Sequence, residues 1–262
     1  MAKQCDSKLE KMIGKTIVEL GLVEITEIEQ AVKKVVQEKA PVRGEIKYRI
    51  NTDLTAFYEF ILTPVFNDDE EVDAIAGTER DITERKSFEK EAWHRANYDF
   101  LTDLPNRSLF RDRLEQQVML SERTGNLAAL LFIDLDNFKE ANDSLGHEAG
   151  DQLLKQAASR IRSCIRQNDT VARMGGDEFT IILTDFEEVS HVKKIANKVL
   201  KELAKPFLIS GKKVLISGSI GISLVPQDAS SSEELIINAD QAMYKVKNDG
   251  RNSYRFYSSE NK

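Results

Sequence analysis

Short apolar runs alternate with polar segments along the second half of the chain. Residues 127–133 read L-A-A-L-L-F-I, a run too long for a loop and too short for a typical helix, so we predict a buried strand. Two further runs, 171–174 and 179–183, are rich in β-forming residues and flank Gly175 and Gly176. Because glycine reaches positive φ without steric cost, this pattern predicts two paired strands joined by a tight turn.

Helical periodicity marks segments between and after these strands. From Gly150 to Ile165 the apolar residues fall on one face, namely Leu153, Leu154, Ala157, Ala158, Ile161 and Ile165. A later helix is expected to start near Ser231, which forms a capping-box pattern with Glu234. Lys247 and Arg251 stand four residues apart at its close, and this spacing predicts that both cations share one helix face.

The first third of the chain reads as a separate small α+β unit. Its helical spacing and its strand-like runs lie at 28–36, 43–50, 56–65 and 72–78. Asp81 can cap a following helix, with Glu84 as its capping-box partner, and this helix would run toward Asp99. Its apolar positions do not form clean heptads over enough turns to predict a coiled coil. We therefore expect a domain at 1–81, a helical linker at 82–97 and a second domain at 98–262.

Composition and charge narrow the classes of function. A chain of 262 residues that is 41% hydrophobic can form one large or two ordinary domains. Its net charge of −7 argues against non-specific binding to nucleic acid or anionic membranes, but not against one nucleotide held with metal ions. Cys5 and Cys164 are too few for a disulfide framework. Since neither a membrane-spanning run nor a secretory signal is visible, we expect a cytoplasmic protein without membrane insertion.

Carboxylates follow the predicted strands. Asp134 ends the apolar run at 127–133, and Asp177 and Glu178 follow the two glycines. Ligands gather outside the carboxyl ends of strands in α/β sheets, so Asp134 and Asp177 converge if their strands are neighbours. Converging carboxylates suit Mg²⁺ ions that bridge nucleotide phosphates. The alternative is that these acids merely end a strand and a hairpin, and each segment alone leaves both interpretations open.

Taken together, the two segments resemble a known family. The chain resembles the GGDEF domain of diguanylate cyclases in F-I-D-L-D-N-F-K-E-A-N-D-S-L-G-H-E-A-G-D (132–151) and R-M-G-G-D-E-F (173–179). The resemblance extends to N-Y-D-F-L-T-D-L-P-N-R (97–107), S-I-G-I-S-L-V-P (219–226) and A-D-Q-A-M-Y-K-V-K-N-D-G-R-N (239–252). It covers roughly Tyr98 to Tyr257. It implies an α/β (α+β) fold like the palm of nucleotidyl cyclases, with a central, mainly antiparallel sheet flanked by helices.

The segments before the linker resemble a second family. Residues 58–86, which end in D-I-T-E-R-K, resemble the C-terminal half of a PAS sensor domain, and I-G-K-T-I-V-E-L at 13–20 resembles its middle. We expect the first strands of that fold to be missing, because almost no sequence precedes residue 13. We therefore expect a partial PAS domain at 1–81 that acts as a small α+β unit without a ligand.

The resemblance implies a reaction and a metal site. Diguanylate cyclases condense two GTP into cyclic di-GMP and release two pyrophosphates. The implied ligands of Mg²⁺ (or Mn²⁺) are Asp134, Asp177, Glu178 and the carbonyl of Leu135. Asp177 and Glu178 are the implied catalytic residues, with Glu178 as a metal ligand or general base, and the acid that takes the proton is left open.

The resemblance also implies the residues that bind GTP. Asn142 and Asp151 would read the guanine, and His147 would lie near the base and ribose. Lys139, Lys247 and Arg251 would contact phosphates, beside the bare backbone of Gly175 and Gly176. Each residue also has a structural interpretation: the lysines as solvated charges, His147 as a structural histidine, and Asp151 as charge compensation at a helix N-terminus.

The resemblance further implies regulation and assembly. Arg166-Gln167-Asn168-Asp169 is an R-x-x-D element ending four residues before Arg173, where the family binds cyclic di-GMP as an inhibitor. Arg166, Asp169 and Arg173 are the implied product-binding residues, and a surface ion pair is the default alternative. Since each domain would bind one GTP, a homodimer is expected. One rival function is a non-catalytic receptor for GTP or cyclic di-GMP, but such receptors usually lose the hairpin acids, which are intact here. The other is a PAS dimerisation module, which leaves a set of residues unexplained, namely Asp134, Asn142, Asp151, Lys247 and Arg251.

Overall fold

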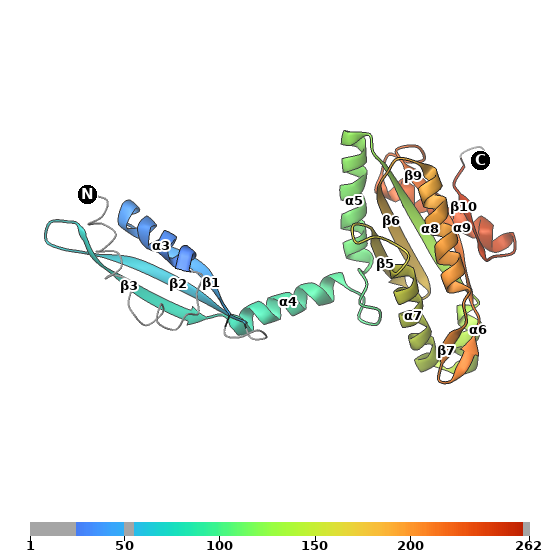
Figure 1. The fold of residues 1–262 in the computed structure, drawn as a ribbon, viewed down its shortest axis with the longest axis horizontal. Coiled ribbons are helices and arrows are strands. Elements are labelled where there is room, and N and C mark those ends of the chain that lie inside the picture. Colours follow the sequence, from blue (N-terminus) through green and yellow to red (C-terminus); the bar gives the residue numbers. More distant parts are fainter. Residues whose placement is uncertain (1–24, 50–54, 259–262) are drawn as a thin grey trace. The chain divides into compact units, whose positions relative to one another are not determined.

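The chain folds into two units, each with its own sheet and apolar core (Figure 1). The computed structural model describes residues 25–49 and 55–258. Contacts divide the chain into Met1–Trp93 and His94–Lys262.

The described part of the first unit is an antiparallel sheet of order β1-β2-β3 with a helix packed on it. Its elements are α3 (Ile25–Glu38), β1 (Val42–Arg49), β2 (Thr55–Phe66) and β3 (Val72–Asp81). Ala31 of α3 lies in one buried cluster with Ile46, Tyr48 and Phe60 of the sheet. The helix and the three strands predicted here are confirmed, whereas the PAS-like segment at 13–20 lies outside the described residues.

A solvent-exposed helix, α4 (Thr83–Asn97), follows β3. The carboxylate of Asp81 accepts a hydrogen bond from the backbone N–H of Thr83, the first residue of the helix, at 2.8 Å, so it satisfies one N–H of the first turn. None of the residues in α4 is buried. The helix ends two residues before Asp99, close to the predicted boundary.

The second unit is built on a five-stranded sheet of order β10-β9-β4-β6-β5. Its elements are α5 (Arg107–Thr124), β4 (Leu127–Asp136), α6 (Phe138–Leu145), α7 (His147–Arg162), β5 (Thr170–Gly175), β6 (Glu178–Phe186), α8 (Val189–Leu203), β7 (Phe207–Ile209), β8 (Lys212–Val214), β9 (Ser217–Val225), α9 (Ser232–Asn248) and β10 (Ser253–Phe256). Only the β9–β10 pair of this sheet is parallel, so the predicted mainly antiparallel sheet is confirmed.

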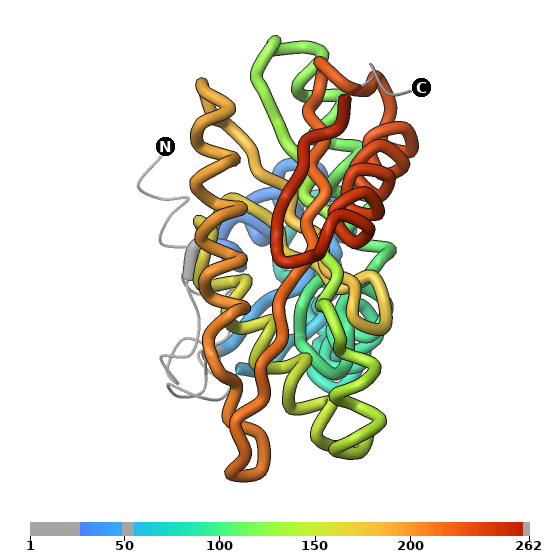
Figure 2. Tube along the Cα trace, turned by 90° about the vertical axis from the view of Figure 1, so that its right-hand side faces the viewer, coloured from blue at the N-terminus to red at the C-terminus, as the bar shows by residue number. Residues whose placement is uncertain are grey.

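Helices cover both faces of this sheet. One apolar cluster joins the sheet to α7 and α8, and a second joins it to α5 and α9. Figure 2 shows α8 in orange and α9 in red on opposite sides of the strands. The central strand β4 is buried from Ala128 to Asp136, as expected for a strand covered on both faces.

Both predicted helices of this unit are present, and the first of them starts earlier than predicted. The first, α7, begins at His147 rather than Gly150. The second, α9, begins after its N-cap Ser231, whose hydroxyl accepts from the N–H of Glu234 at 3.2 Å. The Glu234 carboxylate in turn accepts from the N–H of Ser230, one residue before the expected partner.

The prediction that Lys247 and Arg251 share one helix face is wrong. The helix ends at Asn248, and Gly250 and Arg251 have φ values of 108° and 64°. Such left-handed backbone is incompatible with a continuing α-helix. The chain instead reverses there and enters β10, so Arg251 lies in the turn after the helix.

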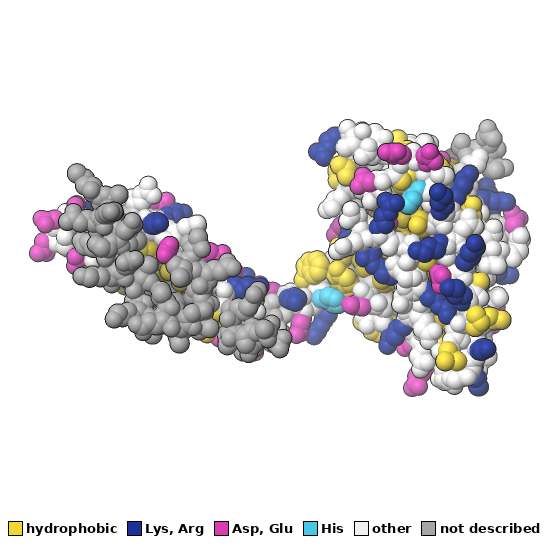
Figure 3. Space-filling view, viewed as in Figure 1, with side chains coloured by type: hydrophobic (Ala, Val, Ile, Leu, Met, Phe, Trp, Pro, Cys, Tyr) yellow, Lys and Arg dark blue, Asp and Glu magenta, His cyan; other side chains and the backbone are white. Residues whose placement is uncertain are grey.

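Basic side chains gather on one face of the second unit, over α7 and α8 (Figure 3). The exposed lysines of α8 are Lys193, Lys194, Lys198 and Lys201. Among the helices that the structure describes, every one is too short or too polar to cross a membrane.

Candidate active site

The turn between β5 and β6 is built from two glycines in left-handed backbone. Gly175 and Gly176 have φ values of 144° and 52°, and a Cβ on either would meet no atom within 4 Å. The conformation selects glycine, and the open space leaves the backbone accessible. The following residues, Asp177 and Glu178, are half-buried at the start of β6.

Strand register brings the predicted acids together. Asp134 of β4 lies directly opposite Glu178 of β6. The N–H of Leu135 donates to the carbonyl oxygen of Asp177 at 3.3 Å, which ties the turn to the end of β4. Lys247 reaches the same place from α9, with its Nζ 2.7 Å from Oδ2 of Asp134. The structure therefore places Asp134, Asp177, Glu178 and Lys247 in one cluster.

This cluster carries more negative than positive charge. Burial raises the pKa of the Glu178 carboxyl, and the nearby carboxylates of Asp134, Asp177 and Asp240 raise it further. Burial also raises the pKa of Asp134, and the hydrogen bond from Lys247 offsets this only in part. Crowded carboxylates of this kind favour the approach of a cation.

The donor set fits Mg²⁺ or Mn²⁺. Within the described residues, no group of three or more His, Cys, Asp or Glu side chains is placed to hold a metal ion by itself. Mg²⁺ usually needs only one or two carboxylates, together with waters and substrate phosphates. Asp134 and Asp177 supply such hard oxygen atoms beside an open backbone turn.

Asp136 has a structural role and is not one of the clustered acids. It is buried and accepts hydrogen bonds from the hydroxyls of Ser217 and Ser219 at 2.6 and 2.7 Å. The backbone N–H of Asn252 adds a third at 3.2 Å. These bonds satisfy the Asp136 carboxylate and fasten β4 to β9 and to the turn before β10.

The residues expected to read the base lie on α6 and α7. Nδ2 of Asn142 is 3.2 Å from Nδ1 of His147, within hydrogen-bond distance. A Cβ at Gly150 would lie 3.0 Å from Cγ of Asn142, so the glycine makes room for this amide. Asp151 and Lys139 are exposed on the same two helices.

Comparison with known proteins identifies this arrangement. Residues 96–253 match the family described as "Diguanylate cyclase, GGDEF domain". The chain belongs to the GGDEF domain family. Residues 5–87 match the PAS fold.

Two curated relatives each match a little under two thirds of this chain. The bifunctional diguanylate cyclase/cyclic di-GMP phosphodiesterase MucR of Pseudomonas aeruginosa is 48% identical over 164 residues, which cover 63% of this chain and 24% of MucR. The diguanylate cyclase TpbB of the same species is 42% identical over 163 residues, or 62% of this chain and 38% of TpbB. The chain thus spans between about a quarter and two fifths of the length of these relatives.

Solved structures agree on the fold. The GGDEF domain of TpbB (YfiN) from P. aeruginosa aligns with a TM-score of 0.59 at 40% identity, covering 60% of this chain and 98% of that domain. The coiled coil and GGDEF domain of DgcB from Caulobacter crescentus, in complex with c-di-GMP, aligns with a TM-score of 0.62 at 27% identity. That match covers 67% of this chain and 93% of the other.

The R-x-x-D element of the GGDEF domain forms a closed loop before β5. The buried carboxylate of Asp169 accepts from the backbone N–H groups of Arg166 at 3.1 Å and Thr184 at 3.3 Å. The Arg166 side chain is exposed. Asp169 therefore shapes the loop, whereas Arg166 presents a cation to solvent.

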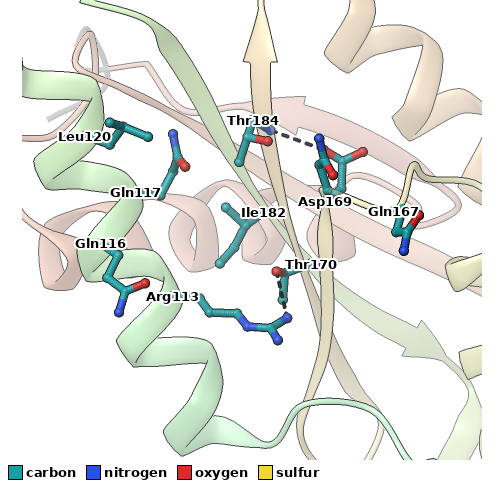
Figure 4. A pocket seen from close by; sticks show the side chains of 10 residues that line it. Arg113, Gln116, Gln117, Leu120, Gln167, Asp169, Thr170, Ile182 and Thr184 are labelled. Atoms are coloured by element: carbon teal, nitrogen blue, oxygen red, sulfur yellow. Dashed lines mark hydrogen bonds between the residues drawn. The ribbon is translucent and has the colours of Figure 1, made fainter. Parts of the chain in front are cut away.

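A polar groove of about 400 Å³ adjoins this loop, between α5 and the strands β5 and β6 (Figure 4). Arg113 of α5 crosses it and donates from Nη1 to the hydroxyl of Thr170 at 3.1 Å. Other groove-lining side chains are Gln116, Gln117, Gln167 and Asn168.

Sequence reasoning missed two features of the GGDEF domain. Asp240 contributes to the negative field at Glu178, and its position seven residues before Lys247, two helical turns away on one face, was an available signal. Arg173 forms an ion pair with Asp99 at 3.0 Å, although the sequence indicated product binding for Arg173. No local pattern connects these two residues, which lie 74 positions apart.

Proposed function

We propose that the GGDEF domain condenses two GTP into cyclic di-GMP and two pyrophosphates. The observation that carries this proposal is the intact acidic cluster, in which Asp134, Asp177 and Glu178 lie beside Lys247 and the open glycine turn. Membership of the diguanylate cyclase family supports the same reaction. We also expect a cytoplasmic location, where GTP is available.

In each transfer, the 3′-oxygen of one GTP forms a bond to the α-phosphorus of the other. The bond from that phosphorus to the oxygen bridging to the β-phosphate breaks, and pyrophosphate leaves. The hydroxyl proton passes to a base. Glu178 is suited to the role of general base, because burial and the neighbouring carboxylates raise its pKa above that of an ordinary glutamate.

The proposed metal residues are Asp134, Asp177, Glu178 and the carbonyl of Leu135. Mg²⁺ or Mn²⁺, when bound, neutralises phosphate charge and lowers the pKa of a hydroxyl. Lys247 stands 2.7 Å from Asp134, where its ammonium can also meet a phosphate at the edge of the cluster.

The proposed nucleotide contacts lie around this centre. Asp151 would accept hydrogen bonds from the N–H groups of the guanine edge, and the Asn142 amide would donate to a guanine acceptor, with His147 fixing the orientation of that amide. Lys139 and Arg251 would supply further cations for the triphosphate. Arg251 would do so from the turn after α9, since it lies outside the helix.

Catalysis in this proposal needs two chains. Each GGDEF domain holds one GTP, and the attacking 3′-hydroxyl belongs to the GTP that is bound to the second domain. Specific activity should therefore rise with protein concentration as homodimers form. Full turnover in a preparation shown to be monomeric by analytical ultracentrifugation would contradict this part of the proposal.

We further propose that cyclic di-GMP inhibits the enzyme through the R-x-x-D loop. Arg166 is the exposed cation available for guanine or phosphate, while Asp169 holds the loop. Arg166→Ala should relieve product inhibition without changing the loop, and Gln167→Ala is the neighbouring control. Unchanged inhibition in Arg166→Ala would count against this site.

The decisive experiment is incubation of the purified chain with GTP and Mg²⁺, with chromatography of the products. Glu178→Gln tests the acidic cluster, and Asp185→Asn is a matched control because Asp185 is an exposed carboxylate on the same strand. Cyclic di-GMP from wild type and control, but not from Glu178→Gln, is the expected result. If the wild type forms no product, the chain is fused to a dimerising domain and the assay is repeated. A fusion protein that binds GTP but still forms no cyclic di-GMP would favour the receptor function.

A further inference from the structure

A largely buried ion pair joins the start of the GGDEF domain to its glycine turn. Nη1 of Arg173 lies 3.0 Å from both carboxylate oxygens of Asp99, and the two side chains are only 10% and 15% exposed. The Asp99 carboxylate also accepts from the N–H and hydroxyl of Thr102 at 2.9 and 2.6 Å. Burial alone would raise the pKa of Asp99, but the hydrogen bonds from Thr102 and Arg173 lower it below its ordinary value.

The other edge of the same guanidinium holds the turn itself. Nε and Nη2 of Arg173 donate to the carbonyl oxygen of Gly176 at 3.0 and 2.7 Å. That carbonyl belongs to the peptide that leads directly into Asp177. Because the two glycines have wide conformational freedom, this pair of hydrogen bonds restricts a segment that side-chain packing does not hold.

The loop that carries Asp99 is bonded to the last residues of α4 through Asn106. Asn106 donates from its backbone N–H to the carbonyl of Asn97 and from Nδ2 to the carbonyl of Ala96, both at 2.8 Å. Pro105 accepts from the backbone N–H of Arg173 at 2.9 Å. The loop at 97–106 is therefore bonded both to the end of the linker helix and to β5.

We propose that Asp99 and Arg173 are positioning residues that hold the Gly175–Gly176 turn, and with it Asp177 and Glu178, in register with the end of α4. The catalytic consequence rests on the proposed function. The fork geometry of arginine explains the choice of residue, because one planar group must donate in two directions at once. In this proposal Arg173 supports catalysis rather than binding the product.

The test combines hydrogen exchange with kinetics. Arg173→Met and Asp99→Asn should speed amide exchange at 175–178 and lower kcat by about 10- to 100-fold, with a smaller change in the KM for GTP. Arg173→Lys should be intermediate, since a single ammonium cannot span both partners. Asp99→Asn keeps the shape of the side chain, so it remains informative if Arg173→Met unfolds.

The matched control is Arg113→Met. Arg113 also donates to a residue of β5, Thr170, but at the opposite end of the strand from the turn. This control should leave exchange at 175–178 unchanged, whatever its effect on thermal stability. The double variant Asp99→Asn/Arg173→Met should lose no more kcat than the worse single variant, because both act through one contact.

Two results would overturn the proposal. One is unchanged exchange at 175–178 in folded Asp99→Asn and Arg173→Met. The other is wild-type kcat in Arg173→Met together with weakened product inhibition, which would make Arg173 a product contact. Since hydrogen exchange needs no turnover, an inactive wild type would defeat the proposed function and still leave this inference open to the exchange test.

Discussion

Gly221 of β9 is the position where a single methyl group should most directly disturb the GGDEF domain. A Cβ there would meet the carbonyl oxygen of Ala239 and the amide nitrogen of Met243, and would lie 2.9 Å from Cα of Met243. Carbon atoms in optimal contact are about 3.5–4.0 Å apart, so α9 or β9 must move by at least about 0.6 Å against this carbon alone. The obstructing atoms are helix backbone and cannot rotate aside.

The expected cost follows from this rigidity. Overpacking a close-packed core costs about 1–3 kcal/mol, and each kcal/mol lowers the Tm of a domain of this size by about 2–4 °C. We therefore expect Gly221→Ala to lower the Tm by roughly 2–12 °C. Because α9 also carries Lys247, which lies 2.7 Å from Asp134, a displaced helix should lower cyclase turnover by about 10- to 100-fold.

Thermal unfolding followed by circular dichroism measures this effect, and Gly218→Ala is its control. Gly218 lies on the same strand, but the atom nearest to its Cβ is Cδ1 of Leu203 at 2.9 Å, the end of a flexible side chain. This control should lose less than about 1 kcal/mol, because the leucine can change rotamer. Equal melting temperatures for the two variants would refute the argument that close backbone approach holds α9 on the sheet.

Three further predictions concern charge and capping. Lys247→Met should lower the free energy of unfolding by about 1–3 kcal/mol in denaturant titrations, because the buried Asp134 carboxylate loses its ammonium partner; no change would contradict this. Since the folded pKa of Asp99 lies below its unfolded value of about 3.9, its stabilising contribution is present above that pH and is lost as pH falls through the folded pKa. Asp99→Asn should therefore flatten the acid limb of a stability–pH curve below about pH 4, and an unchanged limb would argue against the ion pair. Ser231→Ala should cost about 0.5–2 kcal/mol by removing the acceptor for the N–H of Glu234, with Ser230→Ala near neutral as control.

The local pattern of apolar residues and glycines was sufficient to predict the strand and the turn that carry the acids. The apolar run before Asp134 could only be buried, and two glycines between β-rich runs could only form a reversal. That Asp134 and Asp177 converge was predicted only on the condition that their strands are neighbours, and the structure meets this condition by pairing β4 with β6, with Asp134 opposite Glu178.

The helix ends were less predictable. The first turn of α7 contains one small apolar residue, Ala149, which is too weak a signal to mark the helix start. Left-handed backbone at Gly250 and Arg251 follows the end of α9, so the i, i+4 pair is not completed.

The sequence by itself determined the central strand and the glycine turn, because each depends on neighbours within a few residues, and the resemblance to the GGDEF family indicated which acids would form the site. Only the tertiary structure decided which polar side chains already form hydrogen bonds or ion pairs within the protein. Asp136 accepts hydrogen bonds from serines about 80 positions away, and Arg173 forms an ion pair with an aspartate 74 positions away. Such partners are chosen by how strands and loops pack in space. A charged residue in a motif therefore remained compatible with ligand binding until its structural partner could be seen.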